Sequence, residues 1–351
     1  MNVELIQALN DIEKEKGIPK EMLLDAIKAA LKSAYKRDFG SAGNVEIDIE
    51  EDTGEVSVYS TKEVVEQVTD QEEEISLVEA QKKNPNYELG DQVELEVTPG
   101  NFGRIAAQTA KQVVIQRIRE AERDIIYEEF SNRERDIVTG IVQREHKKNI
   151  IIDLGKTEAI LIPPEQIQNE EYEQGDRIKV YIVEVNETTK GPNILVSRTH
   201  PGLLKRLFEL EVPEIHDGVV EIKAVAREAG SRSKIAVHST EEDVDAVGSC
   251  VGPNGSRVRI IVDQLNGEKV DIVQWNEDIG TFISNALSPA EVVEVDVDES
   301  ENVAKVVVPD YQLSLAIGKE GQNARLAAKL TGWKIDIKSE SQLEENDSGL
   351  F

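Results

Sequence analysis

The sequence is poor in the residues on which disulfides and zinc sites depend. It contains one cysteine, Cys250, and four histidines scattered along 351 residues. A single cysteine excludes an internal disulfide, and these residues cannot supply the cysteine and histidine ligands of a structural zinc site. Aromatic residues make up only 4% of the chain, but 39% of its residues are hydrophobic, which is enough for ordinary cores. We therefore expect no disulfide, no metal site and no cofactor.

Long apolar runs and a secretory leader are also missing. No apolar run approaches the ~20 residues that span a bilayer. Residues Met1–Leu5 lack the basic segment followed by an apolar one that begins a signal peptide. We therefore expect a cytoplasmic protein with no membrane partner. A chain of 351 residues is long for one core and suits three or four modules of ordinary size.

Net positive charge, the usual mark of a nucleic-acid-binding protein, is absent as well. The formal net charge is −29 at pH 7, which should repel phosphate. Because salt mutes charges beyond about 8–10 Å, any contact with RNA would have to be local. The acidity also predicts modest affinity for RNA and favours a basic protein surface as a second partner.

What the sequence has instead is an internal duplication built around two Gly-x-x-Gly loops. The first loop is Gly252–Gly255 and the second is Gly318–Gly321. Each follows a short run of small and apolar residues and precedes a helical pattern. The similarity continues downstream, where Leu265–Ile272 matches Leu330–Ile337. Self-similarity at a domain's spacing indicates a repeated structural unit.

A loop of this kind can hold nucleic acid because its glycines have no Cβ, so the backbone can approach a phosphate closely. The following helix adds its N-terminal N–H groups and the positive end of its dipole. This is the arrangement of the KH module, whose Gly-x-x-Gly loop clamps about four nucleotides of single-stranded RNA. A lone loop is commonly just a helix end and restart, but two matched copies favour RNA binding. The predicted RNA contacts are Gly252, Pro253, Asn254, Gly255, Ser256, Arg257 and Arg259, and Gly318, Lys319, Glu320, Gly321, Gln322, Asn323 and Arg325.

The first part of the chain, residues 1–131, predicts a helical or α+β N-terminal domain. Apolar spacing indicates helices at Val3–Ile12 and Glu21–Lys36. Residues 44–60 alternate about a turn at Asp52–Gly54, as in a β-hairpin. An acidic, mixed stretch covers 61–90, and a strand follows at Val93–Val97.

A long connecting helix is predicted at about 104–130. It would be roughly 40 Å long at 1.5 Å per residue, more than a compact module needs, which suits a spacer between domains. Its basic residues offer either a solvated face or a contact surface, and both interpretations stay open.

Residues 132–200 predict a five-stranded OB-type barrel. It carries the motifs G-x-V, D-L-G-x-x-x-A-x-L, G-D-x-I-x-V and L-V-S-R in this order, and this order resembles the S1-type RNA-binding barrel. That family usually stacks bases on aromatic side chains, for which Tyr172 and Tyr181 are the only candidates here. The best predicted RNA contacts are instead Arg144, His146, Lys147 and Lys148. The expected strands are Asp136–Val142, Asn149–Gly155, Ala159–Ile162, Ile178–Val185 and Asn193–Arg198.

Residues 201–277 and 278–340 predict two tandem KH domains. In each, a helix precedes two strands, then the helix–loop–helix segment and a last strand, which is the type II order. The connection from Val273 to Ile279 is short, so we expect the two domains to pack against each other. Residues 341–351 are acidic and polar and predict a disordered tail.

Taken together, this order resembles the bacterial transcription termination/antitermination factors of the NusA family. The specific carriers of the resemblance are Gly103–Gln112, Ser197–Pro201, Val251–Arg257 and Ala316–Arg325. The resemblance implies that the N-terminal domain binds DNA-dependent RNA polymerase near the RNA exit channel, while the barrel and KH domains hold the nascent RNA. It implies effects on pausing, intrinsic termination and antitermination, with other elongation or antitermination factors as further partners.

Catalytic readings have weaker support, and we expect no catalytic residues. Gly155-Lys156-Thr157 resembles the end of a P-loop but lacks its first glycine. Gly248–Gly252 has the G-x-C-x-G form of a nucleophile elbow around Cys250, which leaves a cysteine hydrolase as one alternative. Another is an accessory subunit of RNA turnover, since S1 and KH modules also occur on nucleases.

Overall fold

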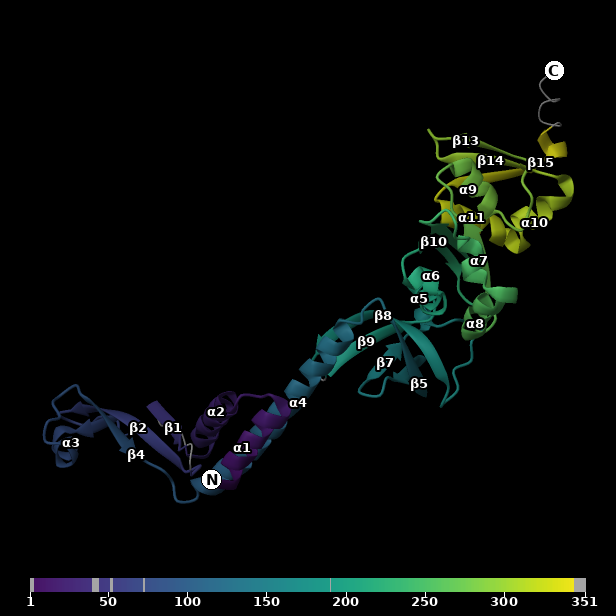
Figure 1. Cartoon of the computed structure of the whole chain (residues 1–351). Coiled ribbons are helices and arrows are strands. Elements are labelled where there is room, and N and C mark those ends of the chain that lie inside the picture. The colour runs from purple at the N-terminus through teal and green to yellow at the C-terminus, as the bar shows by residue number, and fades with distance from the viewer. Residues whose placement is uncertain (1–2, 40–43, 51–52, 72, 190, 344–351) are drawn as a thin grey trace. The chain divides into compact units, whose positions relative to one another are not determined.

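The computed structural model describes residues 3–39, 44–50, 53–71, 73–189 and 191–343 (Figure 1). The chain divides into two compact units, an N-terminal unit Met1–Ile125 and a C-terminal unit Ile126–Phe351. None of the helices in these described ranges is both long and apolar enough to cross a membrane.

The core of the N-terminal unit forms between helices and a sheet. Helix α1 (Val3–Lys16), helix α2 (Lys20–Phe39) and the first half of α4 (Phe102–Ser131) bury Leu9, Ile27 and Phe102 against β1 (Asn44–Ile49) and β2 (Val56–Val65). Strands β1 and β2 pair antiparallel, as the alternation predicted. Asp52 of the predicted turn lies outside the described residues.

The stretch 61–90 is more ordered than the sequence suggested. It contains the end of β2, strand β3 (Glu74–Ser76), which pairs parallel with β2, and helix α3 (Leu77–Lys83). Ser76 caps this helix by accepting a hydrogen bond from the Glu79 amide. With β4 (Gln92–Glu96), these elements enclose a small core of Val64, Ile75, Ala80 and Val93. The sequence did not predict this core, because its few apolar residues are scattered among many acidic ones.

Helix α4 is continuous over 30 residues, as the periodicity predicted. Its first half buries Ala106, Ala110 and Val114 in the core of the N-terminal unit. Its last turn buries Phe130 in the core of the barrel. The role of this helix as a spacer stays a prediction.

The described residues after α4 form a closed barrel in the order β5-β6-β7-β9-β8, so the prediction of a five-stranded OB-type barrel is confirmed. A short parallel pairing joins β7 to β9, and β5 closes the ring on β8. A Cβ at Gly140 would lie 2.3 Å from Ile152 Cγ2, so only glycine fits where these strands curve together. The strands are β5 (Ile137–His146), β6 (Asn149–Asp153), β7 (Glu158–Leu161), β8 (Arg177–Thr188) and β9 (Gly191–Ser197).

The two KH domains repeat one topology. In each, the first helix packs on a sheet whose first two strands are antiparallel and whose last strand is parallel to its neighbour. This confirms the helix-first, type II order. The first domain contains α5 (Pro201–Glu211), α6 (Pro213–His216), β10 (Val220–Glu228), β11 (Arg232–Ser239), α7 (Ala246–Val251), α8 (Ser256–Gln264) and β12 (Lys269–Gln274). The second contains α9 (Ile279–Ala286), β13 (Glu294–Asp298), β14 (Val303–Val308), α10 (Leu313–Ile317), α11 (Gln322–Thr331) and β15 (Lys334–Ser339).

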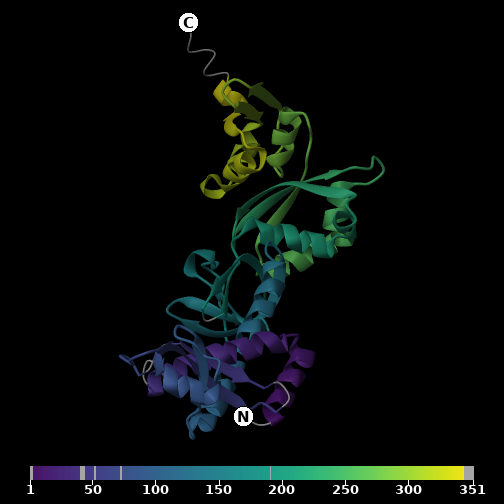
Figure 2. The ribbon, with the colours of Figure 1, turned by 90° about the vertical axis from the view of Figure 1, so that its left-hand side faces the viewer.

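The barrel and the first KH domain share a buried polar seam. Helix α5 lies between the barrel and the sheet β10-β11-β12 (Figures 1 and 2). Arg198 at the end of β9 is fully buried, donates to the Glu170 carboxylate and to the Gln264 carbonyl, and so joins the two domains. Asn266 donates to the same carboxylate. A hydrogen-bonded network around a buried ion pair favours one relative placement of the domains.

The two KH domains pack against each other, as their short connection predicted. Ala226, Ala236 and Val273 of the first sheet belong to one core with Phe282 and Leu326 of the second domain. Helix α11 lies against β10 at this interface (Figure 1).

The start of the predicted tail is ordered. Residues 340–343 form a helical turn, and the Ser341 hydroxyl donates a hydrogen bond to Asp310 at 2.5 Å. Residues 344–351, on which the rest of the prediction falls, lie outside the described residues.

Candidate nucleic-acid interface

The two Gly-x-x-Gly loops have the same backbone. Gly252 has φ 72° and ψ 172°, and Gly318 has φ 75° and ψ 171°. This region of backbone space is open essentially to glycine alone. The last glycines, Gly255 and Gly321, both lie in the left-handed region at φ 74°. The duplication seen in the sequence is therefore a duplication of loop conformation.

The residue between the paired glycines is also left-handed in both loops. Asn254 has φ 52° and Glu320 has φ 53°. Asparagine tolerates this conformation, whereas for a glutamate it costs roughly 1–2 kcal/mol. Strain that recurs at one loop position is typical of a functional site.

The first glycine of each loop is needed for packing beneath the loop as well as for close approach from outside. A Cβ at Gly252 would lie 2.7 Å from Arg257 Cγ, and a Cβ at Gly318 would lie 2.8 Å from the Asn323 backbone nitrogen. The last glycines are not crowded, since a Cβ at Gly255 or Gly321 would meet its nearest neighbour only at about van der Waals distance. The sequence interpretation, which rested on access for phosphate, missed this internal requirement.

Two predicted RNA contacts, Arg257 and Asn323, turn inward and hold the loops together. Each is the second residue after its loop's last glycine. Arg257 donates to the Ser249 carbonyl at 2.6 Å and to Glu214 at 2.8 Å. Asn323, which is 4% exposed, donates to the Ala316 carbonyl at 3.0 Å and to the Leu287 carbonyl at 2.9 Å. Both side chains thus tie the helix after the loop to the carbonyls of the helix before it.

Other predicted contacts face solvent. Pro253, Asn254 and Ser256 are exposed on the first loop, and Lys319 and Glu320 on the second. Within the described part of the chain, neither the Arg259 guanidinium nor the Lys319 ammonium has a hydrogen-bond or ion-pair partner. Of the predicted contacts in the two loop segments, these two cations are therefore the ones that a phosphate could reach directly.

Arg325 and Gln322 are instead engaged with the first KH domain. Arg325 donates to both oxygens of Glu228, at 2.6 and 3.1 Å, and to the Glu320 carbonyl at 3.0 Å. Gln322 donates to Glu228 at 2.9 Å and to the Ser231 hydroxyl at 2.8 Å. The hydrogen bond from Arg325 holds the pKa of the Glu228 carboxyl below its usual value, so this residue is anionic at neutral pH. Glu228 was missed, and nothing in the repeat pattern could have found it.

The second KH domain also exposes apolar side chains in the segment that leads into its loop. Leu315 and Ile317 of helix α10 are exposed, and Tyr311, which precedes this helix, is 75% exposed. Flat and apolar groups of this kind can contact nucleobases. The sequence could have predicted these exposed apolar side chains, because helix α10 carries more apolar residues than one buried face requires.

In the barrel, the predicted contacts His146, Lys147 and Lys148 are exposed at the turn between β5 and β6. Both lysines have positive φ, at 50° and 68°. Arg144 is paired with Glu158 through two hydrogen bonds of 3.0 Å.

The two tyrosines considered for base stacking in the barrel are not available for it. Tyr181 is buried and stacks on His200 at 4.4 Å between ring centroids. Tyr172 donates to Glu170 at 2.8 Å, and burial raises the pKa of its hydroxyl. Any RNA contact of this barrel would thus depend on the charged turn.

The residues behind the catalytic alternatives have structural roles. Cys250 lies fully buried in helix α7, and burial, with the nearby Glu214 charge, raises the pKa of its thiol to about 12. Its reactive thiolate form is therefore strongly disfavoured. Lys156 pairs with Glu129 at 2.6 Å beside a barrel turn.

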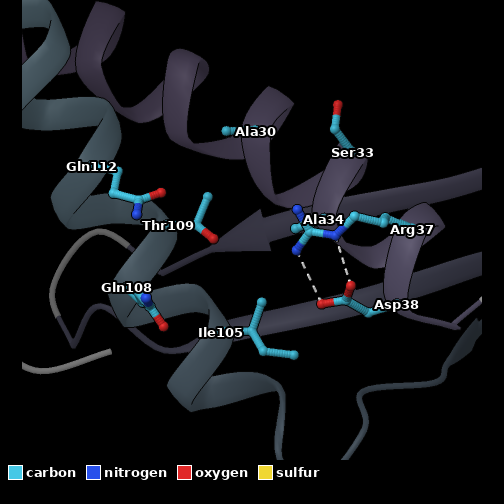
Figure 3. A pocket seen from close by; sticks show the side chains of 9 residues that line it. All are labelled: Ala30, Ser33, Ala34, Arg37, Asp38, Ile105, Gln108, Thr109 and Gln112. Carbon is cyan, nitrogen blue, oxygen red and sulfur yellow. Dashed lines mark hydrogen bonds and ion pairs between the residues drawn. The ribbon is translucent and has the colours of Figure 1, made fainter.

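The N-terminal unit carries a hollow of about 600 Å³ between α2 and the first half of α4 (Figure 3). Arg37 and Asp38 pair with each other at its rim, at 2.7 Å. Apart from Ile105, the rest of its lining is small or polar: Ala30, Ser33, Ala34, Gln108, Thr109 and Gln112.

Comparison with known proteins accounts for nearly the whole chain. Family models match in order: the NusA N-terminal domain at residues 4–124, the S1 RNA-binding domain at 132–197, the NusA-like first KH domain at 198–275 and the NusA-like second KH domain at 279–345.

Several relatives match this chain over at least 90% of their own length. A protein of Halalkalibacterium halodurans is 64% identical over 98% of this chain and 90% of its own length. One of Bacillus subtilis is 62% identical over 100% and 97%, and one of Thermus thermophilus is 42% identical over 100% and 93%. All three are named transcription termination/antitermination protein NusA. The chain therefore belongs to the NusA family.

Proposed function

We propose that this chain is a non-enzymatic transcription elongation factor of the cytoplasm. It binds RNA polymerase and nascent single-stranded RNA and modulates pausing, intrinsic termination and antitermination. The names of its relatives support this function. The single observation that carries it is the pair of Gly-x-x-Gly loops with matching backbone dihedrals, both within one compact unit.

The RNA-binding part of the proposal rests on local chemistry, because the net charge of −29 opposes it. Each loop opens onto the first turn of a helix, whose N–H groups and dipole favour an anion. Arg259 and Lys319 add unpaired positive charge beside these turns. Exposed Leu315 and Ile317, in the helix that leads into the second loop, offer apolar contact for bases. We propose that the barrel turn at His146–Lys148 extends the same path.

The polymerase-binding part is assigned to residues 1–131, with a contact near the RNA exit channel. The hollow between α2 and α4 is a surface that a partner side chain could enter. Other elongation or antitermination factors would join the same complex.

The decisive experiment measures the lifetime of a paused complex in a defined transcription system, with and without the protein. We expect the full chain to change this lifetime. Paired aspartates at Lys319 and Glu320, or at Pro253 and Asn254, should remove the effect because they repel phosphate. A lifetime that is the same with the full chain as without it would overturn the proposal.

The assignment of the polymerase contact is tested separately. Residues 126–351 form a compact unit of their own, so a chain lacking residues 1–125 should keep its RNA affinity but lose co-purification with polymerase. Retained co-purification would contradict this assignment while leaving RNA binding in place.

A further inference from the structure

The Glu228 carboxylate occupies a place beside the second loop that is suited to an anion. It lies at the end of β10 in the first KH domain and accepts hydrogen bonds from Gln322 and Arg325, both in the first turn of helix α11. Arg325 also donates to the Glu320 carbonyl within the loop. A carboxylate from one domain is thus seated at the helix N-terminus that follows the loop of the other, where anions are favoured.

The duplication provides an internal comparison. Arg259 and Arg325 are each the fourth residue after the last glycine of their loop. Arg259 is exposed, and no side chain within the described ranges pairs with it. Arg325 is neutralised by Glu228. The two loops therefore have the same backbone but offer different net charge to a phosphate.

The Arg325–Glu228 pair is accessible enough to exchange partners. Its side chains are 47% and 21% exposed, whereas the pairs Arg198–Glu170 and Arg227–Glu268 are at most 1% exposed. If Arg325 moves to another anion, Glu228 keeps its hydrogen bond from Gln322 and the favourable charge of Lys329 nearby. Neither group would be left buried without a partner, so exchange carries no large desolvation penalty.

We propose that Glu228 holds Arg325 in the free protein and releases it to a backbone phosphate when RNA binds. The first loop then presents its arginine at all times, and the second gains its arginine only by exchange. This inference rests on the proposed RNA binding. Glu228 then lowers the affinity of the second loop for RNA. Removing its carboxylate should therefore strengthen RNA binding.

The test uses the full chain and a single-stranded RNA oligonucleotide, with affinity measured by fluorescence anisotropy at several salt concentrations. Glu228→Gln should bind RNA about threefold to fivefold more tightly, in line with the usual strength of an exposed ion pair. Glu221→Gln is the matched control, because Glu221 lies on the same strand and also pairs with a cation, Lys223. It should change affinity little.

The exchange itself is tested through Arg325. Arg325→Gln should lower the slope of log affinity against log salt by about 0.7, the loss expected for one phosphate contact on a single strand. In that background Glu228→Gln should no longer raise affinity. Arg325→Lys, which keeps the charge, should keep most of the slope. Thermal unfolding of each variant checks that the fold is retained.

Three outcomes would overturn the inference: Glu228→Gln binding RNA no more tightly than the natural chain, an equal gain with and without Arg325, or an unchanged salt slope in Arg325→Gln. These results are distinct from a failure of the proposed function. In that case the natural chain would not bind RNA, or the paired aspartates in the loops would leave its affinity unchanged.

Discussion

The two KH domains have the same topology but different surroundings. In the first, the outer face of the sheet is covered by the second domain, and Ala226, Ala236 and Lys234 are buried there. In the second, the corresponding face carries exposed Lys305 and Asp336. Lys234 lies opposite Asp271, and Lys305 opposite Asp336, at matching places on parallel strands. The same pair of charges is thus an interior contact in one domain and a surface feature in the other.

The difference extends to the loops. After the first loop, Arg257 holds the backbone and Arg259 is free for a phosphate. After the second, Asn323 holds the backbone and Arg325 contacts the neighbouring domain. A repeat therefore conserves the backbone that a function needs, while the packing of its neighbours decides what each side chain does.

The largest expected difference between the domains is at the paired lysines. Lys234 donates to Asp271 at 3.0 Å and to the Ser288 carbonyl at 2.8 Å, and its side chain is fully buried. Lys234→Met should lower the free energy of unfolding by about 3 kcal/mol, the low end for a broken buried pair, because Arg232 still holds Asp271. Lys305→Met should stay within about 0.5 kcal/mol. Urea unfolding of both variants measures these free energies. Equal losses of stability would show that burial of the Lys234 pair does not add to its contribution.

The next effect concerns the first glycine of each loop. Alanine at Gly252 or Gly318 should lower the free energy of unfolding by about 1–3 kcal/mol, since the conformation is open essentially to glycine. Gly318→Ala should cost more, because its Cβ meets the Asn323 backbone nitrogen, whereas at Gly252 it meets side-chain atoms of Arg257, which can shift more easily than backbone. Thermal unfolding and RNA affinity of the two variants should rank in this order. The reverse ranking would mean that the second loop relaxes more easily than its contacts suggest.

An effect of the same size or smaller is expected at the two residues that hold the loops, Asn323 and Arg257. Asn323→Ala removes two buried hydrogen bonds, to the Ala316 and Leu287 carbonyls, and should lower the free energy of unfolding by about 1–3 kcal/mol. Arg257→Ala should cost less, near 1 kcal/mol, because the Arg257 side chain is 26% exposed and water can replace it. Hydrogen exchange at the amides of the two loops would show where each variant loosens. Equal loss of protection from exchange in the two variants would contradict the expected difference in stability.

These residues also show how far the sequence could be interpreted. Apolar spacing and the duplication predicted the barrel, both KH topologies and the place of each loop, because these depend on local pattern. The same pattern could not tell that Arg257 and Asn323 point inward. A polar side chain just after a glycine-rich loop can either contact RNA or hydrogen-bond to the protein's own backbone. Glu228 could not be found at all, because its partners are distant in the chain and meet it only through packing of the two domains.

The smallest effect is expected from a single exposed cation. Lys319 stands on the second loop where the first loop has Pro253, so the second loop has a cation that the first lacks. Lys319→Gln should weaken RNA binding only a few-fold and reduce the salt slope by about 0.7, because one phosphate contact is lost. Lys305→Gln removes the same charge from the sheet of that domain and should leave the slope unchanged. Equal changes in both variants would mean that net charge, rather than the loop, governs binding.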